Sequence, residues 1–203
     1  MREQFEEIYD QNKWGYGSGA GSLPNHTRSY ARVLEEFISE HDIKTILDLG
    51  CGDWQFSRYI DWGEARYIGV DLVRSVIDRN IELFSADNIE FRLFSGDFDE
   101  LPEADLLIAK DVLQHWSNDS VSSFLPVLDR YPYSLITNCA NPKGETRNID
   151  IEDGEYRYLD IRLPPFNVDA EEIFSFTKHR PFLLRYVKPV RWLKRVLLVR
   201  PQA

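Results

Sequence analysis

The chain has few of the residues that build cross-links or metal clusters. Its 203 residues include only two cysteines, Cys51 and Cys139, and four histidines. Two cysteines cannot make a disulfide framework, and no spacing of Cys and His is typical of a zinc site. We therefore expect a reducing compartment, and neither a disulfide framework nor a zinc site.

Long apolar runs are also missing. No stretch approaches the length of a membrane-spanning helix, about 20 residues, and residues 1–7 lack the apolar core of a signal peptide. The net charge of −10 argues against general nucleic-acid binding. We expect a cytoplasmic protein without a membrane span or a nucleic-acid partner. The length, with 43% hydrophobic residues, suits a single domain over residues 1–203.

A glycine turn near position 50 is the central motif of the chain. Residues 46–49 predict a short buried parallel strand, which runs into Gly50 and Gly52. Residues 55–60 then read as the start of a helix, so that free N–H groups would face the turn. A dinucleotide-binding motif needs a third glycine three residues after Gly52, and Gln55 stands there instead. The pattern thus disfavours an NAD-dependent oxidoreductase.

An acid just before the glycines can receive a cationic, amino-bearing ligand, and Asp48 has that position. The string Asp48-Leu49-Gly50-Cys51-Gly52 resembles the first motif of class I S-adenosylmethionine (SAM) methyltransferases. Trp54 stands where that motif usually has a further glycine. The resemblance implies SAM as cofactor and S-adenosylhomocysteine (SAH) as product.

A second acid follows the next predicted strand. Residues 66–70 form a short apolar run that ends at Asp71, about twenty residues after the glycine turn. A carboxylate at this spacing accepts hydrogen bonds from both ribose hydroxyls in nucleotide-binding folds. Leu72 begins a predicted helix over residues 72–83 and is expected to line the same site.

A third acid follows the strand predicted over residues 89–93, which alternates apolar and polar side chains. The resemblance implies that Asp97 receives the adenine amino group and that Phe98 contacts the face of the ring. A simple turn is the alternative explanation for Gly96-Asp97. Acids at three successive strand ends favour the cofactor site.

The N-terminal residues 1–40 are predicted to form a lid and a helix. Four glycines lie within residues 14–22, together with Trp14 and Tyr16. Linkers seldom carry such aromatic residues, so we expect a loop that folds over the cofactor, with Trp14 or Tyr16 as its apolar contact. Arg28, near the start of the following helix, is a candidate for the cofactor carboxylate or an ordinary surface arginine.

The loop after the fourth predicted strand, residues 106–109, is the candidate catalytic segment. It runs from Lys110 to His115 and resembles the corresponding motif of small-molecule class I methyltransferases. Lys110 is expected beside the cofactor. If the acceptor is a hydroxyl, His115 is the candidate general base and Asp111 the second candidate, or the group that orients His115. A metal could replace the base, with Asp111 and Asp150 as ligands, although their spacing does not indicate a metal site.

The second half of the chain completes a predicted class I fold. The elements expected here are a helix capped by residues 117–119, a strand at 134–138, a substrate-side insertion at 139–168, a helix at 169–178 and strands at 182–187 and 193–199. Together with the first half, they predict an α/β fold with a doubly wound, seven-stranded, mostly parallel sheet and a C-terminal antiparallel hairpin.

The resemblance spans residues 14–199 and is closest to small methyltransferases that decorate bacterial and viral glycans. It implies O-methylation of a sugar or glycan hydroxyl. A small metabolite or a protein side chain are alternative acceptors, and a non-catalytic SAM-binding module is the alternative to an enzyme. The oligomeric state is left open.

Overall fold

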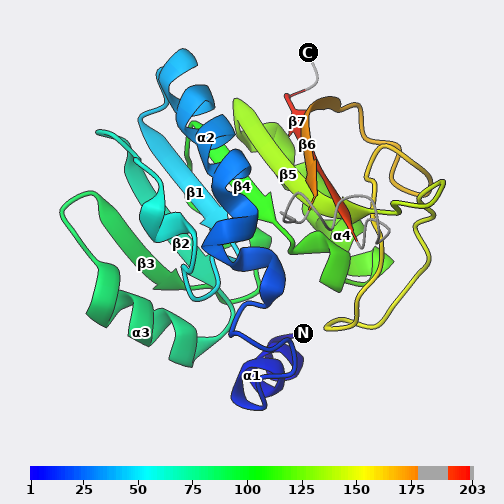
Figure 1. Ribbon diagram of the computed structural model, residues 1–203, viewed down its shortest axis with the longest axis horizontal. Helices are drawn as coiled ribbons and strands as arrows, with labels where there is room; N and C mark the ends of the chain where they lie inside the picture. The colour runs from blue at the N-terminus through cyan, green and yellow to red at the C-terminus, as the bar shows by residue number, and fades with distance from the viewer. Residues whose placement is uncertain (178–191, 202–203) are drawn as a thin grey trace, which may run out of the picture.

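The computed structural model describes residues 1–177 and 192–201, which contain a seven-stranded sheet with the order β3-β2-β1-β4-β5-β7-β6 (Figure 1). Strands β1 to β5 pair in parallel, β7 is antiparallel to β5, and β6 is antiparallel to β7. The strands are β1 (Thr45–Leu49), β2 (Arg66–Asp71), β3 (Ile89–Leu93), β4 (Leu106–Lys110), β5 (Tyr133–Ala140), β6 (Glu171–Thr177) and β7 (Leu193–Val199). The predicted fold class, with a mostly parallel sheet and an antiparallel C-terminal end, is confirmed.

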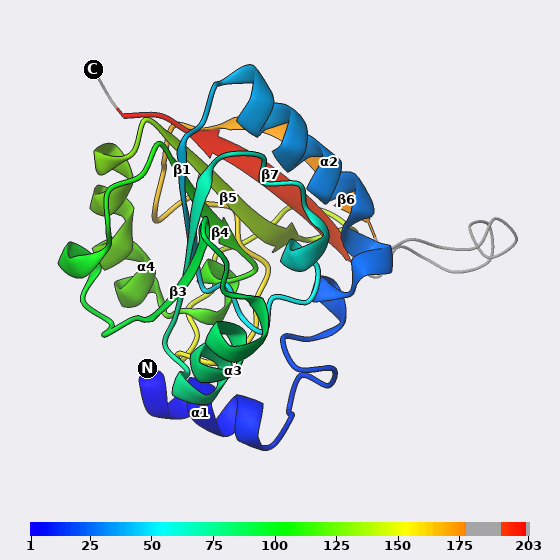
Figure 2. The same cartoon turned by 90° about the vertical axis from the view of Figure 1, so that its left-hand side faces the viewer.

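Both faces of the sheet are buried, because successive strand residues point to opposite sides. In β1, Ile46 packs in one core cluster, while Leu47 and Leu49 pack in the other. Helix α2 covers the first face and α4 the second (Figure 2). The helices are α1 (Arg2–Asp10), α2 (Pro24–Glu40), α3 (Arg74–Phe84) and α4 (Asn118–Phe124), with short 3-10 turns at Ala20–Ser22, Ser57–Tyr59, Phe98–Glu100, Leu113–His115 and Leu125–Arg130.

Two predicted helices are wrong. Residues 55–60 contain only the 3-10 turn Ser57–Tyr59, because Trp54, at φ 55°, turns the chain inward and packs on the ring of Phe91 at 5.2 Å. Residues 171–177 form the strand β6 instead of a helix. Phe174 and Phe176 recur every second residue there, which is the period of a strand. The strand predicted at 182–187 lies outside the described residues.

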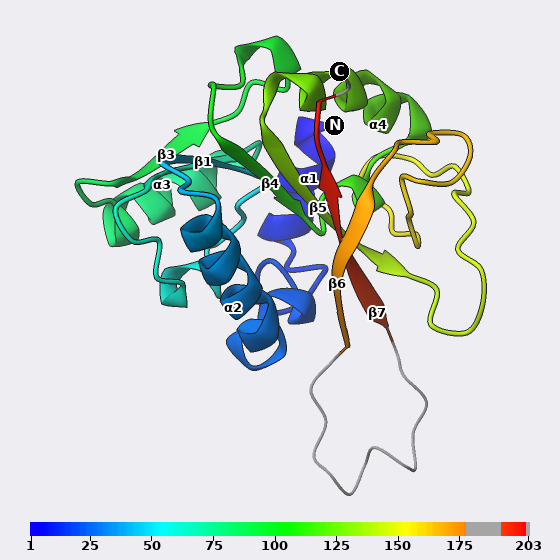
Figure 3. The same cartoon turned by 90° about the horizontal axis from the view of Figure 1, so that it is seen from above.

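Residues 141–168 contain no helix or strand, as the sequence predicted, whereas the first two residues of the predicted 139–168 insertion belong to β5. This segment leaves the end of β5 and lies beside α4, on the opposite side of the molecule from α3 and β3 (Figure 3). Within the described ranges, no helix is long and apolar enough to cross a membrane.

Candidate active site

A cavity of about 350 Å³ opens at the carboxyl ends of β1, β2 and β4, where open α/β sheets bind ligands. Most of the residues that the sequence predicted for the site line this cavity: Trp14, Asp48, Gly50, Gly52, Asp71, Leu72, Lys110, Asp111 and His115. The cavity wall also includes residues from the N-terminal segment, from β7 and from the 141–168 segment, so that distant parts of the chain meet here.

Three predicted residues are not brought to this cavity. Arg28 lies on the exposed side of α2, since Thr27 and Tyr30 occupy the buried side. Asp97 is exposed, and its Oδ1 accepts a hydrogen bond from the backbone N–H of Asp99 at 3.0 Å. Phe98 packs against the core aromatics Phe94, Trp116 and Phe124, with ring centroids 5.3 to 5.8 Å apart. The predicted cofactor contacts of these three residues therefore have no support in the cavity geometry.

The glycine turn is closely packed and is held by Asp71. Gly50 and Gly52 both have left-handed backbone angles, with φ of 71° and 55°. A Cβ on Gly52 would overlap the hydroxyl of Ser18, which explains the need for glycine. The carboxylate of Asp71 accepts from the backbone N–H of Gly52 and of Val73, both at 3.0 Å. Burial raises the pKa of Asp71, and these N–H donors oppose the shift.

Asp48 is a buried acid on β1 that faces the cavity. The hydroxyl of Tyr67 donates to Asp48 Oδ2 at 2.5 Å. Burial raises the pKa of Asp48 to about 6, although the Tyr67 hydrogen bond and the charge of Lys110 lower it. A cation bound beside Asp48 would favour the ionised carboxylate, so that this position suits a positively charged ligand group.

Asp111 lies between two buried lysines. Lys110 Nζ is 2.6 Å from Asp111 Oδ2, and Lys194 Nζ, from β7, binds the same oxygen. Burial acts to raise the pKa of Asp111, but the two ammonium groups outweigh it and lower the pKa to about 2. A carboxylate with this pKa is a weak base at neutral pH. In the part of the chain that the structure describes, no group of three or more metal-ligating side chains could hold a metal ion.

His115 is held in one tautomer by its neighbours. Its Nδ1 is 2.7 Å from the backbone carbonyl oxygen of Glu155, which can only accept, so Nδ1 carries the proton. Gln114 Nε2 is 3.3 Å from His115 Nε2, and the Gln114 amide is oriented because its Oε1 accepts from Cys139 N–H at 2.8 Å. Burial lowers the pKa of His115. The result is a neutral imidazole with its lone pair on Nε2.

The N-terminal segment is hydrogen-bonded to the residue that follows the glycine turn. Ser18 Oγ donates to Asp53 Oδ1 at 2.6 Å and accepts from the Asp53 N–H at 3.0 Å. Trp14 lies against the His115 ring, with centroids 4.8 Å apart, whereas Tyr16 is 69% exposed. Of the two aromatic residues expected at the cofactor, the structure brings only Trp14 to the cavity.

Several residues in or next to the cavity were not predicted. Lys194 was predicted only as a residue of the strand at 193–199. Tyr67 was read as a strand residue, although it contacts Asp48. Ser18 and Asp53 carry no sequence signal, because they meet across 35 positions of the chain.

The sequence and the fold agree with known methyltransferases. Residues 46–131 match a family described as "Methyltransferase domain". No curated protein sequence matches the chain. Among solved structures, magnesium protoporphyrin IX methyltransferase from Synechocystis PCC 6803 with bound SAH has a TM-score of 0.64 at 15% identity, over 99% of this chain and 98% of that one.

Two further structures have the same fold. The 1,6-didemethyltoxoflavin-N1-methyltransferase from Burkholderia thailandensis has a TM-score of 0.65 at 16% identity, over 99% of this chain and 87% of that one. The N-terminal domain of EvdMO1, determined in the presence of SAH and D-fucose, has a TM-score of 0.61 at 17% identity, over 99% and 97% of the two chains. At such identities, the structural similarity shows the shared fold.

The domain match covers the glycine turn, Asp71 and His115. Match and fold together indicate an enzyme that transfers a methyl group from SAM: residues 46–131 match a methyltransferase domain, and the described residues have the class I fold. The acceptor is a separate question, which depends on the other half of the cavity.

Proposed function

We propose that this methyltransferase transfers a methyl group to a sugar hydroxyl, with His115 as the general base. The neutral imidazole of His115 on the cavity wall is the observation that carries the proposal. An acceptor hydroxyl that replaces the Gln114 amide at Nε2 can give its proton to this lone pair as the new oxygen–carbon bond forms. The sulfonium of bound SAM supplies the electrophilic methyl group, so the protein must mainly orient the acceptor and remove its proton.

For the cofactor, the cavity offers groups of the required chemistry. We assign the ribose hydroxyls to Asp71, the amino group to Asp48 and the backbone contacts to Gly50 and Gly52. Lys110, which is buried and lines the cavity, takes the carboxylate role first considered for Arg28. Apolar contacts would come from Trp14 and Leu72.

The acceptor side of the cavity has an aromatic lining. Tyr156 and Trp192 line the cavity together with His115. Aromatic rings pack well against the apolar faces of sugars, which supports a sugar acceptor. One structural neighbour was also determined in the presence of a sugar, D-fucose. A small planar metabolite is the second candidate, since two neighbours are named as methyltransferases of a porphyrin and of a toxoflavin precursor.

An acceptor panel tests the proposal. The purified protein would be incubated with SAM and with sugars, phenols, planar heterocycles or an unfolded protein, and SAH would be quantified. We expect SAH with a sugar, together with intact-mass evidence for one added methyl group. Methylation of only a planar heterocycle would favour the metabolite alternative. Tight SAH binding without turnover on any acceptor would favour a non-catalytic module.

A further inference from the structure

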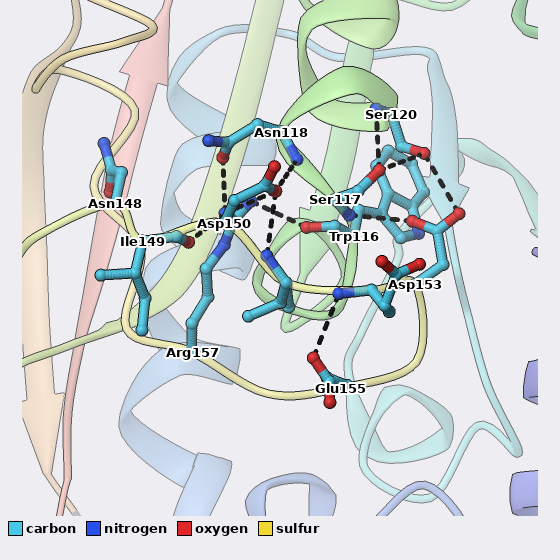
Figure 4. A network of polar contacts seen from close by, with 12 residues as sticks. Trp116, Ser117, Asn118, Ser120, Asn148, Ile149, Asp150, Asp153, Glu155 and Arg157 are labelled. Atoms are coloured by element: carbon cyan, nitrogen blue, oxygen red, sulfur yellow. Dashed lines mark hydrogen bonds and ion pairs between the residues drawn. The ribbon is translucent and has the colours of Figure 1, made fainter.

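The segment after β5 binds the end of the turn that carries His115 and the residues that follow it. Figure 4 shows the contacts with Trp116, Ser117 and Asn118. Three consecutive backbone carbonyls, two in this turn and one just after it, accept hydrogen bonds from that segment. The donors are Arg157 N–H to Gln114 O at 3.1 Å, Gly154 N–H to His115 O at 2.8 Å and Arg157 Nη2 to Trp116 O at 2.7 Å. The turn is only three residues long and makes few backbone hydrogen bonds of its own, so these contacts define its path.

The next two backbone groups are bound from the same segment. Ser117 N–H donates to Asp153 Oδ1 at 2.8 Å, and Asn118 N–H donates to Asp150 Oδ1 at 2.8 Å (Figure 4). Both are free N–H groups at the start of α4, where carboxylates bind favourably. In return, the Glu155 carbonyl accepts from His115 Nδ1. Residues 150–157 are thus hydrogen-bonded to residues 114–118 and fix the path of their backbone.

The side chain of Arg157 connects these two segments. Its side chain is fully buried, and its Nη1 donates to the Ile149 carbonyl and to Asn118 Oδ1, both at 2.5 Å. The nearest carboxylate, Asp150, is 4.0 Å away. Burial lowers the pKa of Arg157, which reflects the cost of a desolvated guanidinium. A buried arginine is suited to this position because its planar guanidinium can donate hydrogen bonds to several backbone groups at once.

We propose that Arg157 is a positioning residue for His115. It fixes residues 149–157 against the turn, so that the Glu155 carbonyl stays on Nδ1–H and the lone pair stays on Nε2. Without that carbonyl, both neutral tautomers of the imidazole become accessible, and only one of them has a basic Nε2. The proposal rests on the proposed function of His115, but its first test needs no acceptor.

The first test is nitrogen NMR on the SAH complex, labelled with ¹⁵N-histidine. The His115 signals are assigned by their loss in His115→Ala. We expect the Nδ1–H tautomer in the wild type and a mixture of tautomers in Arg157→Met, while Arg157→Lys recovers much of the wild-type signal. Arg162→Met is the matched control, because Arg162 lies in the same segment but binds Asp160 and Glu172. Wild-type His115 signals in Arg157→Met would overturn the proposal.

The second test is turnover on the best acceptor of the panel. In Arg157→Met, kcat should fall about tenfold while SAH affinity stays within about twofold, because the imidazole is misplaced and the cofactor half is intact. In the His115→Ala background the same substitution should cause little further loss, since residues that act as a unit are not additive. Fully additive losses would show that Arg157 does not act through His115.

A further variant and the two readouts keep the tests independent. If Arg157→Met does not fold, Asp153→Ala serves instead. It removes the more accessible contact with the Ser117 N–H and should shift the same His115 signals. A tautomer change in Arg157→Met, combined with normal turnover of His115→Ala, would support the positioning role of Arg157 and refute His115 as the general base. A wild-type tautomer in Arg157→Met, combined with a loss of turnover in His115→Ala, would refute the positioning role and support the general base.

Discussion

The two halves of the cavity are held in different ways. On the cofactor half, the glycine turn and Asp71 are joined by local backbone hydrogen bonds at the ends of the neighbouring strands β1 and β2. On the acceptor half, His115 lies on a three-residue turn whose contacts come from residues about forty positions away. The first half is a property of the sheet, and the second depends on an irregular segment folded against it.

This difference teaches that the two halves should fail separately. Damage to the acceptor half should lower turnover and leave cofactor binding intact, whereas damage to the cofactor half should do the reverse at saturating SAM.

The largest expected effect is on the acceptor half. In His115→Ala, turnover should fall about a hundredfold or more, because the acceptor hydroxyl loses the imidazole that takes its proton, and SAH affinity should hardly change. His41→Ala is the matched control, since His41 also directs Nδ1 to a backbone carbonyl, at 3.1 Å, but lies at the end of α2. Steady-state rates measure the turnover, and calorimetry measures the affinity for SAH. Near-normal turnover of His115→Ala would contradict the general-base role.

The next effect is on the cofactor half. Asp71→Ala should weaken SAH binding by roughly ten- to a hundredfold, about 1.5–3 kcal/mol, because a charged hydrogen-bond acceptor is lost. The turnover number at saturating SAM should change little. Asp97→Ala is the control, since Asp97 is exposed outside the cavity and should leave affinity unchanged. Calorimetry that finds Asp97→Ala weaker than Asp71→Ala would reverse the assignment of the two acids.

A smaller effect is expected where Ser18, in the N-terminal segment, is hydrogen-bonded to Asp53, next to the glycine turn. Asp53→Ala removes the carboxylate that accepts from the hydroxyl and the backbone N–H of Ser18, so residues 14–22 should open more often. Limited proteolysis in this segment should become severalfold faster, and SAM should slow it in the wild type, because four glycines make ordering entropically costly. Equal cleavage rates in the wild type with and without SAM would mean that the segment does not cover the cofactor.

The same contrast explains what the sequence could predict. The positions of Asp48, Gly50 and Asp71 follow from short apolar strands and the turns that end them, and such signals are local. The strand β7 and the cap of α4 at Ser117 were predicted on the same grounds, and both are confirmed.

Long-range contacts account for the errors. The residues after Trp54 look helical, but the indole is drawn into an aromatic cluster that no local pattern reveals. Asp97 has the spacing of a strand-end acid, yet the chain turns so that its side chain caps a 3-10 turn outside the cavity. The roles of Arg157 and Lys194 depend on contacts over 41 and 83 positions, which a single sequence does not encode visibly.

The smallest effect is the most specific test of the acceptor half. Burial lowers the pKa of His115, so the acid limb of the turnover profile should lie below the usual histidine value of about 6.5. Lys194 contributes in the same direction, because its charge opposes the imidazolium, while Asp111 favours it. Lys194→Met removes the opposing charge and leaves Asp111 less neutralised, and both changes raise the pKa of His115.

The acid limb of Lys194→Met should therefore move to higher pH. The other groups that contact His115 do not change this sign: the Glu155 carbonyl and the Gln114 amide do not titrate, and the phenol of Tyr156, whose pKa burial raises, stays neutral. Arg200→Met, an exposed change just beyond β7, is the charge-matched control and should leave the limb in place. The pH–rate profiles under saturating SAM decide the matter. A limb that stays fixed or moves to lower pH in Lys194→Met would show that a group other than His115 controls the rate, and the acceptor half would then need a different base.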